Sequence, residues 1–198
     1  MSRHLALFDF DGTITRKDTF IEFIRFKAGL VRLTAGLALI SPVLVLYKLK
    51  LIPNWRAKEI MFGWFFRGMS IEEFRRLGER FATTELPSLV RPSALTKIRE
   101  HQASGHHVLI VTASAEAWIK PWSDQFGITV IATSWEVRDG VLTGKISGRN
   151  CYGPEKKVRI LERVSLSDYE SISVYGDTSG DREMLTLGTL RHYRHFND

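Results

Sequence analysis

The sequence has 198 residues, 44% of them hydrophobic, which is enough for one α/β domain with an insertion and a sizeable core. Its net charge of +6 favours anionic partners such as phosphate esters or anionic lipid surfaces. Aromatic residues are not interleaved with basic ones, which argues against a nucleic-acid-binding surface. The single cysteine, Cys151, excludes an intramolecular disulfide and favours a reducing, cytoplasmic location.

An apolar, strand-like run over 5–8 ends in two carboxylates, Asp9 and Asp11. Residues i and i+2 of a strand point to the same side, so both carboxylates start out on one face at the strand's carboxyl end. Gly12 then permits a sharp turn before Thr13. Ligands bind outside the carboxyl ends of parallel strands, so we expect a site at this position.

A long, mainly helical segment follows, from about residue 16 to residue 90. We expect a helix over 20–27, capped by Asp18 or Thr19, and further helix over 55–84. The segment is far longer than an ordinary connection between a strand and a helix. Such an excursion beside a strand end is typical of a lid or a specificity element.

Within this segment, residues 33–47 carry no charge, and basic residues flank them on both sides. The run is shorter than the roughly 18–20 residues that span a bilayer, and Pro42 interrupts it. Two interpretations remain open. One is a buried helical hairpin of a small cap, bent at Ser41 and Pro42. The other is a peripheral element at the inner face of the membrane.

The rest of the chain alternates helices with strands. We expect helices over 92–104, 115–126 and 154–164, and strands over 108–111, 128–132, 135–138, 141–146, 171–175 and 190–195. This order predicts an α/β fold with a Rossmann-like parallel sheet. The core would comprise residues 1–15 and 91–198, and residues 16–90 would form an α-helical cap inserted after the first strand.

Polar side chains follow two further predicted strands. Thr112 and Ala113 follow the strand over 108–111, and Asp177 and Asp181 follow the strand over 171–175. The carboxyl ends of parallel strands meet at one edge, so these groups should converge with the two carboxylates of the first strand. Four carboxylates in one cleft favour a hard cation, of which Mg²⁺ is the obvious candidate.

A lysine should complete this site. Lys156 or Lys157 would supply a cation from the helix after Gly153, and we favour the first. Among the hydroxyls we favour Thr112 over Ser114, which we expect to cap the next helix. A metal, a lysine, a hydroxyl and a free carboxylate together suit phosphoryl transfer, because the cations let a carboxylate approach a phosphate.

Four segments now resemble, in order and strand context, the four motifs of the haloacid dehalogenase superfamily. They are Asp9-Phe10-Asp11-Gly12-Thr13, Thr112, Lys156 and Gly176-Asp177-Thr178-Ser179-Gly180-Asp181. The resemblance implies that Asp9 is a nucleophile that forms an aspartyl-phosphate. It makes Asp11 the general acid and then the base, while Thr112 and Lys156 hold the phosphate.

The resemblance also implies a metal site and a phosphate cradle. Mg²⁺ would be held by Asp9, Asp177 and the backbone carbonyl of Asp11, with support from Asp181. Three residues are expected beside the phosphate: Gly12, Thr13 and Ala113. Asp18 would either contact the substrate from the cap side or simply cap its helix.

The run Cys151-Tyr152-Gly153-Pro154-Glu155-Lys156 and the place of the insertion resemble the phosphoserine-phosphatase-like branch. True phosphoserine phosphatases have Ser in place of Gly12, Glu in place of Asp18 and a cap Arg near Phe62. These differences disfavour phosphoserine as the substrate. The apolar cap is more similar to that of the bacterial phosphatidylglycerophosphatase members.

The leading prediction is therefore a Mg²⁺-dependent phosphomonoesterase that acts on a phospholipid phosphate such as phosphatidylglycerophosphate. One alternative is a soluble phosphatase of small metabolite esters. A more distant one is a non-catalytic phosphate-binding or receiver-like protein.

Overall fold

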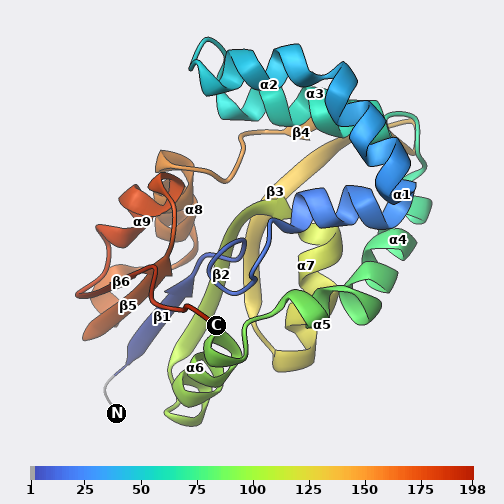
Figure 1. The fold of residues 1–198 in the computed structure, drawn as a ribbon. Helices are drawn as coiled ribbons and strands as arrows, with labels where there is room; N and C mark the ends of the chain where they lie inside the picture. Colours follow the sequence, from blue (N-terminus) through green and yellow to red (C-terminus); the bar gives the residue numbers. More distant parts are fainter. Residues whose placement is uncertain (1–2) are drawn as a thin grey trace.

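The computed structural model describes residues 3–198 and contains one six-stranded sheet with helices on both faces (Figure 1). The strand order is β4-β3-β2-β1-β5-β6, and only β3 and β4 pair antiparallel. The strands are β1 (His4–Phe8), β2 (His107–Ala115), β3 (Thr129–Arg138), β4 (Val141–Ser147), β5 (Ser171–Gly176) and β6 (Leu190–Tyr193). The predicted Rossmann-like parallel sheet is confirmed.

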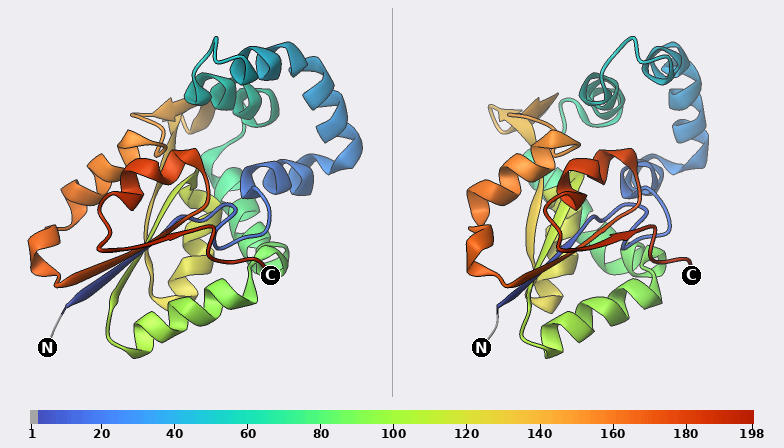
Figure 2. Two further views of the ribbon diagram at one scale, coloured as in Figure 1. Left: turned by 60° about the vertical axis from the view of Figure 1, so that its left-hand side comes forward. Right: turned by 90° about the vertical axis from the view of Figure 1, so that its left-hand side faces the viewer.

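Strand β1 is apolar throughout because both of its faces are covered. Ala6 and Phe8 face a core that includes α6 (Pro92–Ala103) and α7 (Glu116–Ser123). Leu5 and Leu7 face a second core beside α8 (Pro154–Arg163) and α9 (Arg182–Leu185). The turned views in Figure 2 show the helices on the two sides of the sheet. With β2 and β5 as neighbours, β1 brings its carboxyl end to the middle of the sheet edge.

Five helices lie between β1 and α6. They are α1 (Thr19–Leu39), α2 (Ser41–Lys48), α3 (Asn54–Phe66), α4 (Ile71–Thr84) and α5 (Leu86–Leu89). The two connections to this segment run side by side, since Arg16 N donates to Leu89 O at 2.9 Å and Arg91 N donates to Ile14 O at 2.8 Å. The helices therefore leave and rejoin the sheet domain at one place, above the carboxyl ends of the strands (Figure 1).

Aromatic packing fastens these helices to the sheet domain. Phe23 stacks on Trp118 of α7 with ring centroids 4.3 Å apart, and Phe62 stacks on Trp135 of β3 at 3.4 Å. Phe62, near which a cap arginine was considered, is completely buried. Of the two residues expected to cap the first helix, Asp18 is confirmed, because its side chain accepts hydrogen bonds from two backbone amides of α1.

The interpretation of residues 33–47 as a buried hairpin is wrong for most of the segment. Leu33 and Ile40 are buried, but α2 has no buried residue, and Leu39 is 65% exposed. The physical reason is that this part of the helical insertion has few neighbours to pack against. The bend falls near the predicted position: α1 and α2 meet at 61°. A further break lies at Gly29, where φ is +75°.

Among residues 3–198, no single helix has both the length and the hydropathy of a membrane span, although α1 and α2 reach that threshold together as a bent pair.

Element boundaries also differ from expectation in two strands. Strand β2 continues to Ala115, past the predicted end at residue 111, and β3 is one strand where two were predicted. In β2 the pairing register shifts between Val111 and Ala115, and this irregularity has no clear signature in the sequence.

Candidate active site

Asp9 and Lys156 form the buried centre of the site. Asp9 directly follows β1, and its backbone amide donates to Tyr175 O at 2.9 Å, which continues the pairing with β5. Lys156 lies in the first turn of α8, which Pro154 begins. Its Nζ donates to Asp9 Oδ1 (2.5 Å), Asp181 Oδ1 (2.7 Å) and Val111 O (2.9 Å). All three ammonium protons are thus used, and Lys156, which was favoured over Lys157, reaches Asp9.

Burial and charge act against each other in this cluster. Desolvation raises the pKa of Asp9 well above its usual value, and the ammonium of Lys156 opposes that shift. Burial alone would lower the pKa of Lys156, but the carboxylates of Asp9 and Asp181 hold it above its usual value. The lysine is therefore charged at neutral pH, and it provides the positive potential at the end of β1.

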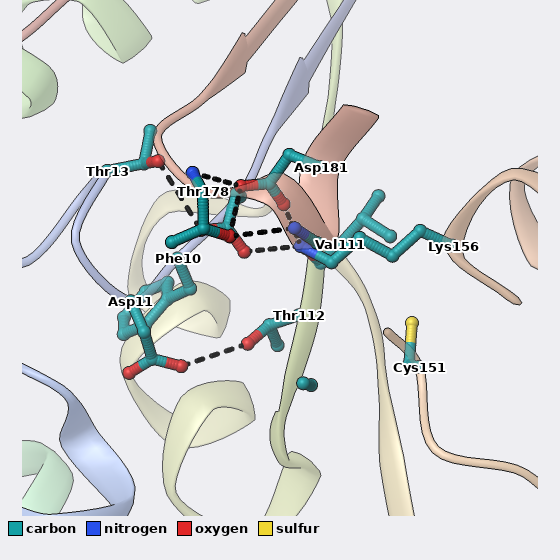
Figure 3. Close-up of polar contacts among 12 residues, drawn as sticks. Phe10, Asp11, Thr13, Val111, Thr112, Cys151, Lys156, Thr178 and Asp181 are labelled. Atoms are coloured by element: carbon teal, nitrogen blue, oxygen red, sulfur yellow. Dashed lines mark hydrogen bonds and ion pairs between the residues drawn. The ribbon is translucent and has the colours of Figure 1, made fainter. Parts of the chain in front are cut away.

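Asp181 organises the loop that follows β5. Its side chain is 1% exposed, and one oxygen binds Lys156. The other oxygen accepts from Asp177 N at 3.1 Å and from Thr178 N at 3.0 Å (Figure 3). Burial would raise the pKa of Asp181, but the charge of Lys156 and these hydrogen bonds hold it below its usual value. The structure thus joins Asp181 to Lys156 directly.

An acidic cluster next to the lysine fits a divalent cation. Oxygens of Asp9, Asp177 and Asp181 lie within 4.8 Å of one another. Three carboxylates against one ammonium leave an excess of two negative charges, and oxygen donors suit Mg²⁺. Thr13 Oγ1 lies 3.3 Å from Asp9 Oδ2 and 3.2 Å from Asp177 Oδ1. At Gly12, where φ is +86°, a Cβ would lie 2.3 Å from Asp177 Oδ2, so this turn requires glycine.

Asp11 was predicted to offer its backbone carbonyl to the metal, and its carboxylate lies outside this acidic cluster, where hydroxyls hold it. Its Oδ1 accepts from the backbone amide (2.7 Å) and the hydroxyl (2.6 Å) of Thr19. Its Oδ2 accepts from Ser114 Oγ at 2.6 Å. The same oxygen accepts from Thr112 Oγ1 at 3.3 Å (Figure 3). The prediction that Ser114 caps the next helix is wrong. Because β2 continues to Ala115, Thr112 and Ser114 lie on one side of the strand and reach the same carboxylate.

A cavity of about 290 Å³ contains Asp9, Asp11 and Lys156, and α1, α2 and α3 form its outer wall. Larger cavities exist, but the one of about 660 Å³ between α4, α7 and β3 contacts none of these three residues. Asp18 lies at the mouth of the smaller cavity, where it also caps α1. Its side chain is accessible to solvent, yet desolvation and the nearby carboxylate of Asp11 raise its pKa to about 6.

Lys58 is a site residue that sequence reasoning missed. From α3 its Nζ donates to the carbonyl oxygen of Ala113 at 2.5 Å, and it lies 5.5 Å from the ring centroid of Phe20. Burial lowers the pKa of Lys58. A signal was present, because Ala57, Lys58 and Met61 share one face of α3, and a basic residue inside an otherwise apolar face of a helix is unusual.

Comparisons with known proteins agree with this geometry. The family model described as haloacid dehalogenase-like hydrolase matches residues 6–186. The chain is 34% identical to protein CicA of Caulobacter vibrioides over 194 residues, covering 97% of this chain and 86% of that protein.

Solved structures share the fold. A protein of unknown function from Bordetella pertussis Tohama I superposes with a TM-score of 0.83 and 26% identity, covering 96% of this chain and 88% of that one. A substrate-bound phosphoserine phosphatase gives a TM-score of 0.66 at 19% identity, covering 98% and 86%. The chain therefore belongs to the haloacid dehalogenase-like hydrolases, and its fold is that of the phosphoserine-phosphatase-like members.

Proposed function

We propose that this hydrolase is a Mg²⁺-dependent phosphomonoesterase that acts through an aspartyl-phosphate on Asp9, with residues 16–90 as its cap domain. The observation that carries the proposal is the separation of the two carboxylates. Asp9 is buried against Lys156, whereas Asp11, two residues later, is held by hydroxyls at the wall of the cavity. This separation supports a role for Asp9 as the group that attacks phosphorus and for Asp11 as the group that exchanges a proton.

In the first step a carboxylate oxygen of Asp9 bonds to phosphorus and the bond from phosphorus to the ester oxygen breaks. Asp11, protonated, gives its proton to the departing oxygen. Lys156 offsets the charge of the phosphate, so that a carboxylate can approach it. In the second step Asp11 takes a proton from water, the water oxygen bonds to phosphorus, and Asp9 is released with inorganic phosphate.

The metal would be held by Asp9, Asp177 and the backbone carbonyl of Asp11, with Asp181 in support. When bound, Mg²⁺ supplies further positive charge beside the phosphate. Thr112, Gly12, Thr13 and Ala113 would surround the phosphoryl oxygens. The carboxylate of Asp11 favours ester hydrolysis over dehalogenation, because a dehalogenase needs no acid for a departing halide.

We assign the substrate as a phospholipid phosphate, such as phosphatidylglycerophosphate. The cavity of about 290 Å³ has room for a phosphorylated headgroup but not for the acyl chains. Leu44, Tyr47 and Met61 give the cap side of the cavity an apolar wall. Lys58 places a cation on that side as well. These features support a phosphate next to a larger apolar body. The protein would then work in the cytoplasm, with residues 33–47 at the inner face of the membrane.

Phosphate release from a panel of substrates tests this proposal. The panel contains phosphatidylglycerophosphate in mixed micelles, phosphoserine, a sugar phosphate and an aryl phosphate, each with Mg²⁺ and with a chelator. We expect hydrolysis to require Mg²⁺ and to favour the lipid, and Asp9→Asn to lower the rate at least about 10³-fold.

Two outcomes separate the parts of the proposal. Preference for a small soluble ester would replace the lipid assignment and leave the phosphatase intact. No release from any substrate, with Asp9→Asn equal to the parent, would refute the phosphatase itself. Thermal unfolding adds a readout for the metal alone: Mg²⁺ should raise the melting temperature of the parent and not that of Asp177→Asn.

A further inference from the structure

The outer part of the cap exposes an unusual amount of apolar surface. Eleven of the 17 exposed large hydrophobic side chains among residues 3–198 lie between residues 30 and 64. We call this set the outer cap surface: Leu30, Val31, Leu39, Val45, Leu46, Tyr47, Leu49, Leu51, Trp55, Ile60 and Trp64. It spans the second half of α1, all of α2 and the exposed side of α3, at the end of the molecule farthest from α6 (Figures 1 and 2). Scattered exposed hydrophobic residues are ordinary, but such a concentration marks an interaction surface.

The charges around this surface are mainly positive, with Glu59 of α3 the acidic residue among them. No Asp or Glu occurs from residue 23 to residue 58, whereas seven Lys or Arg residues do. Among them, four exposed residues lie between or beside the residues of the outer cap surface: Arg32, Lys48, Lys50 and Arg56. An apolar surface bordered mainly by cations complements an anionic partner that is itself apolar beneath its charges.

We infer that the outer cap surface docks on a bilayer that contains anionic lipids. The residue types favour a bilayer over a protein partner. Trp55, Trp64 and Tyr47 belong to the class that gathers at membrane interfaces, where one end of the ring stays wet. Helix α2 begins with Ser41-Pro42 and has no buried residue, so most of its surface stays exposed in the protein alone. A short amphipathic helix that follows a bend can lie in an interface plane without spanning the membrane.

The docking surface adjoins the site. Leu44 and Tyr47 of α2 line the cavity that contains Asp9, so a docked cap places the mouth of that cavity at the lipid headgroups. Delivery of a lipid phosphate to Asp9 rests on the proposed function. Docking itself does not, since it can be measured without turnover.

Co-sedimentation with vesicles tests the inference. We expect the full chain to bind vesicles of phosphatidylcholine with about 30% phosphatidylglycerol and to bind pure phosphatidylcholine weakly. The double variant Val45→Glu/Leu49→Glu should lower the partition coefficient at least roughly tenfold. Replacing both Lys48 and Lys50 by Gln should lower it roughly fivefold per lysine at low salt.

The matched control is Val158→Glu/Leu161→Glu, which adds the same charge at two exposed aliphatic positions of α8. It should bind like the parent. A blue shift of tryptophan emission on adding anionic vesicles, lost in Trp55→Phe/Trp64→Phe, gives a second readout.

Three results would overturn the inference. One is no binding to anionic vesicles, and another is equal loss of binding in the α8 control. The third is a stable dimer of the parent without lipid that Val45→Glu/Leu49→Glu dissociates, because the outer cap surface would then be an interface between two copies. If the protein binds anionic vesicles but releases phosphate from no substrate of the panel, only the phosphatase proposal is refuted.

Discussion

The charged cluster at the strand ends, formed by Asp9, Lys156, Asp177 and Asp181, and the outer cap surface depart from an ordinary soluble protein in opposite ways. At the strand ends, charged groups are buried: Lys156 and Asp181 are 2% and 1% exposed. On the outer cap, aliphatic side chains face solvent, with Val31 at 80% exposed. Buried charges and exposed apolar patches are the informative exceptions to the usual distribution. Neither helps stability by itself, so each marks a place where the fold serves binding or chemistry.

Removing the ammonium from the buried cluster should have the largest effect. Lys156→Met leaves Asp9 and Asp181 buried without their cation, so we expect a loss of about 3–5 kcal/mol in the free energy of unfolding at neutral pH. Phosphate release should fall at least about 10³-fold. Urea denaturation and a phosphatase assay measure the two effects. Lys157→Met is the control and should change stability by less than about 0.5 kcal/mol. Equal effects of the two variants would mean that Lys156 is not the buried partner of Asp9.

Two leucines of α1 test whether the outer cap is truly unpacked. Leu33 is 5% exposed and Leu39 is 65% exposed. Leu33→Ala should destabilise the protein by about 2–5 kcal/mol because it opens a cavity. Leu39→Ala, the same chemical change on the same helix, should cost no more than about 0.5 kcal/mol. A similar cost at both positions, measured by urea denaturation, would show that the outer cap is packed in solution and would remove the contrast between the two regions.

The hydroxyls around Asp11 should have a smaller, purely catalytic effect. Ser114→Ala removes a hydrogen bond of 2.6 Å to the carboxylate, so we expect kcat to fall about tenfold with little change in stability. Ser123→Ala is the matched control, since Ser123 is equally buried but its hydroxyl bonds to Lys120 O, outside the site. The pH profile of kcat should move in Ser114→Ala alone. An unchanged profile and rate would mean that Ser114 does not position Asp11.

A half-buried histidine in the sheet domain predicts a modest pH effect on stability. His101 binds Tyr175 Oη at 3.0 Å and His106 Nδ1 at 2.8 Å and packs on Phe8, with Lys97, Glu100 and His192 also close enough to affect its charge. Desolvation and the nearby His106 lower its pKa to about 4. The unfolded chain therefore binds a proton more readily, and stability falls as the pH drops from about 6.5 toward about 4.

Between pH 7 and pH 5 this histidine should account for about 1 kcal/mol, because solvent screens part of the ring. His101→Gln should flatten the dependence of unfolding free energy on pH over that range. An identical slope in parent and variant would assign the acid sensitivity to other groups.

Much of the site could be predicted from the sequence because its members follow strands directly. Asp9, Asp11, Asp177 and Thr112 each come after an apolar run, and parallel strands place such positions on one edge. Periodicity likewise predicted the alternation of helices and strands and the insertion after the first strand. These features depend on neighbours along the chain, which the sequence displays.

The remaining features of the site depend on contacts between residues that are far apart in the sequence, and only the tertiary structure decides those contacts. Ser114 reaches Asp11 because β2 runs past its apolar stretch, and Lys58 enters the cavity because α3 packs across the strand ends. Both contacts join residues more than 50 positions apart, and no local pattern reports them. The exposure of α2 is decided in the same way. The sequence by itself shows that residues 33–47 are uncharged and mostly apolar. Whether an apolar helix is buried depends on which other elements reach it, and in this fold no residue of α2 is buried.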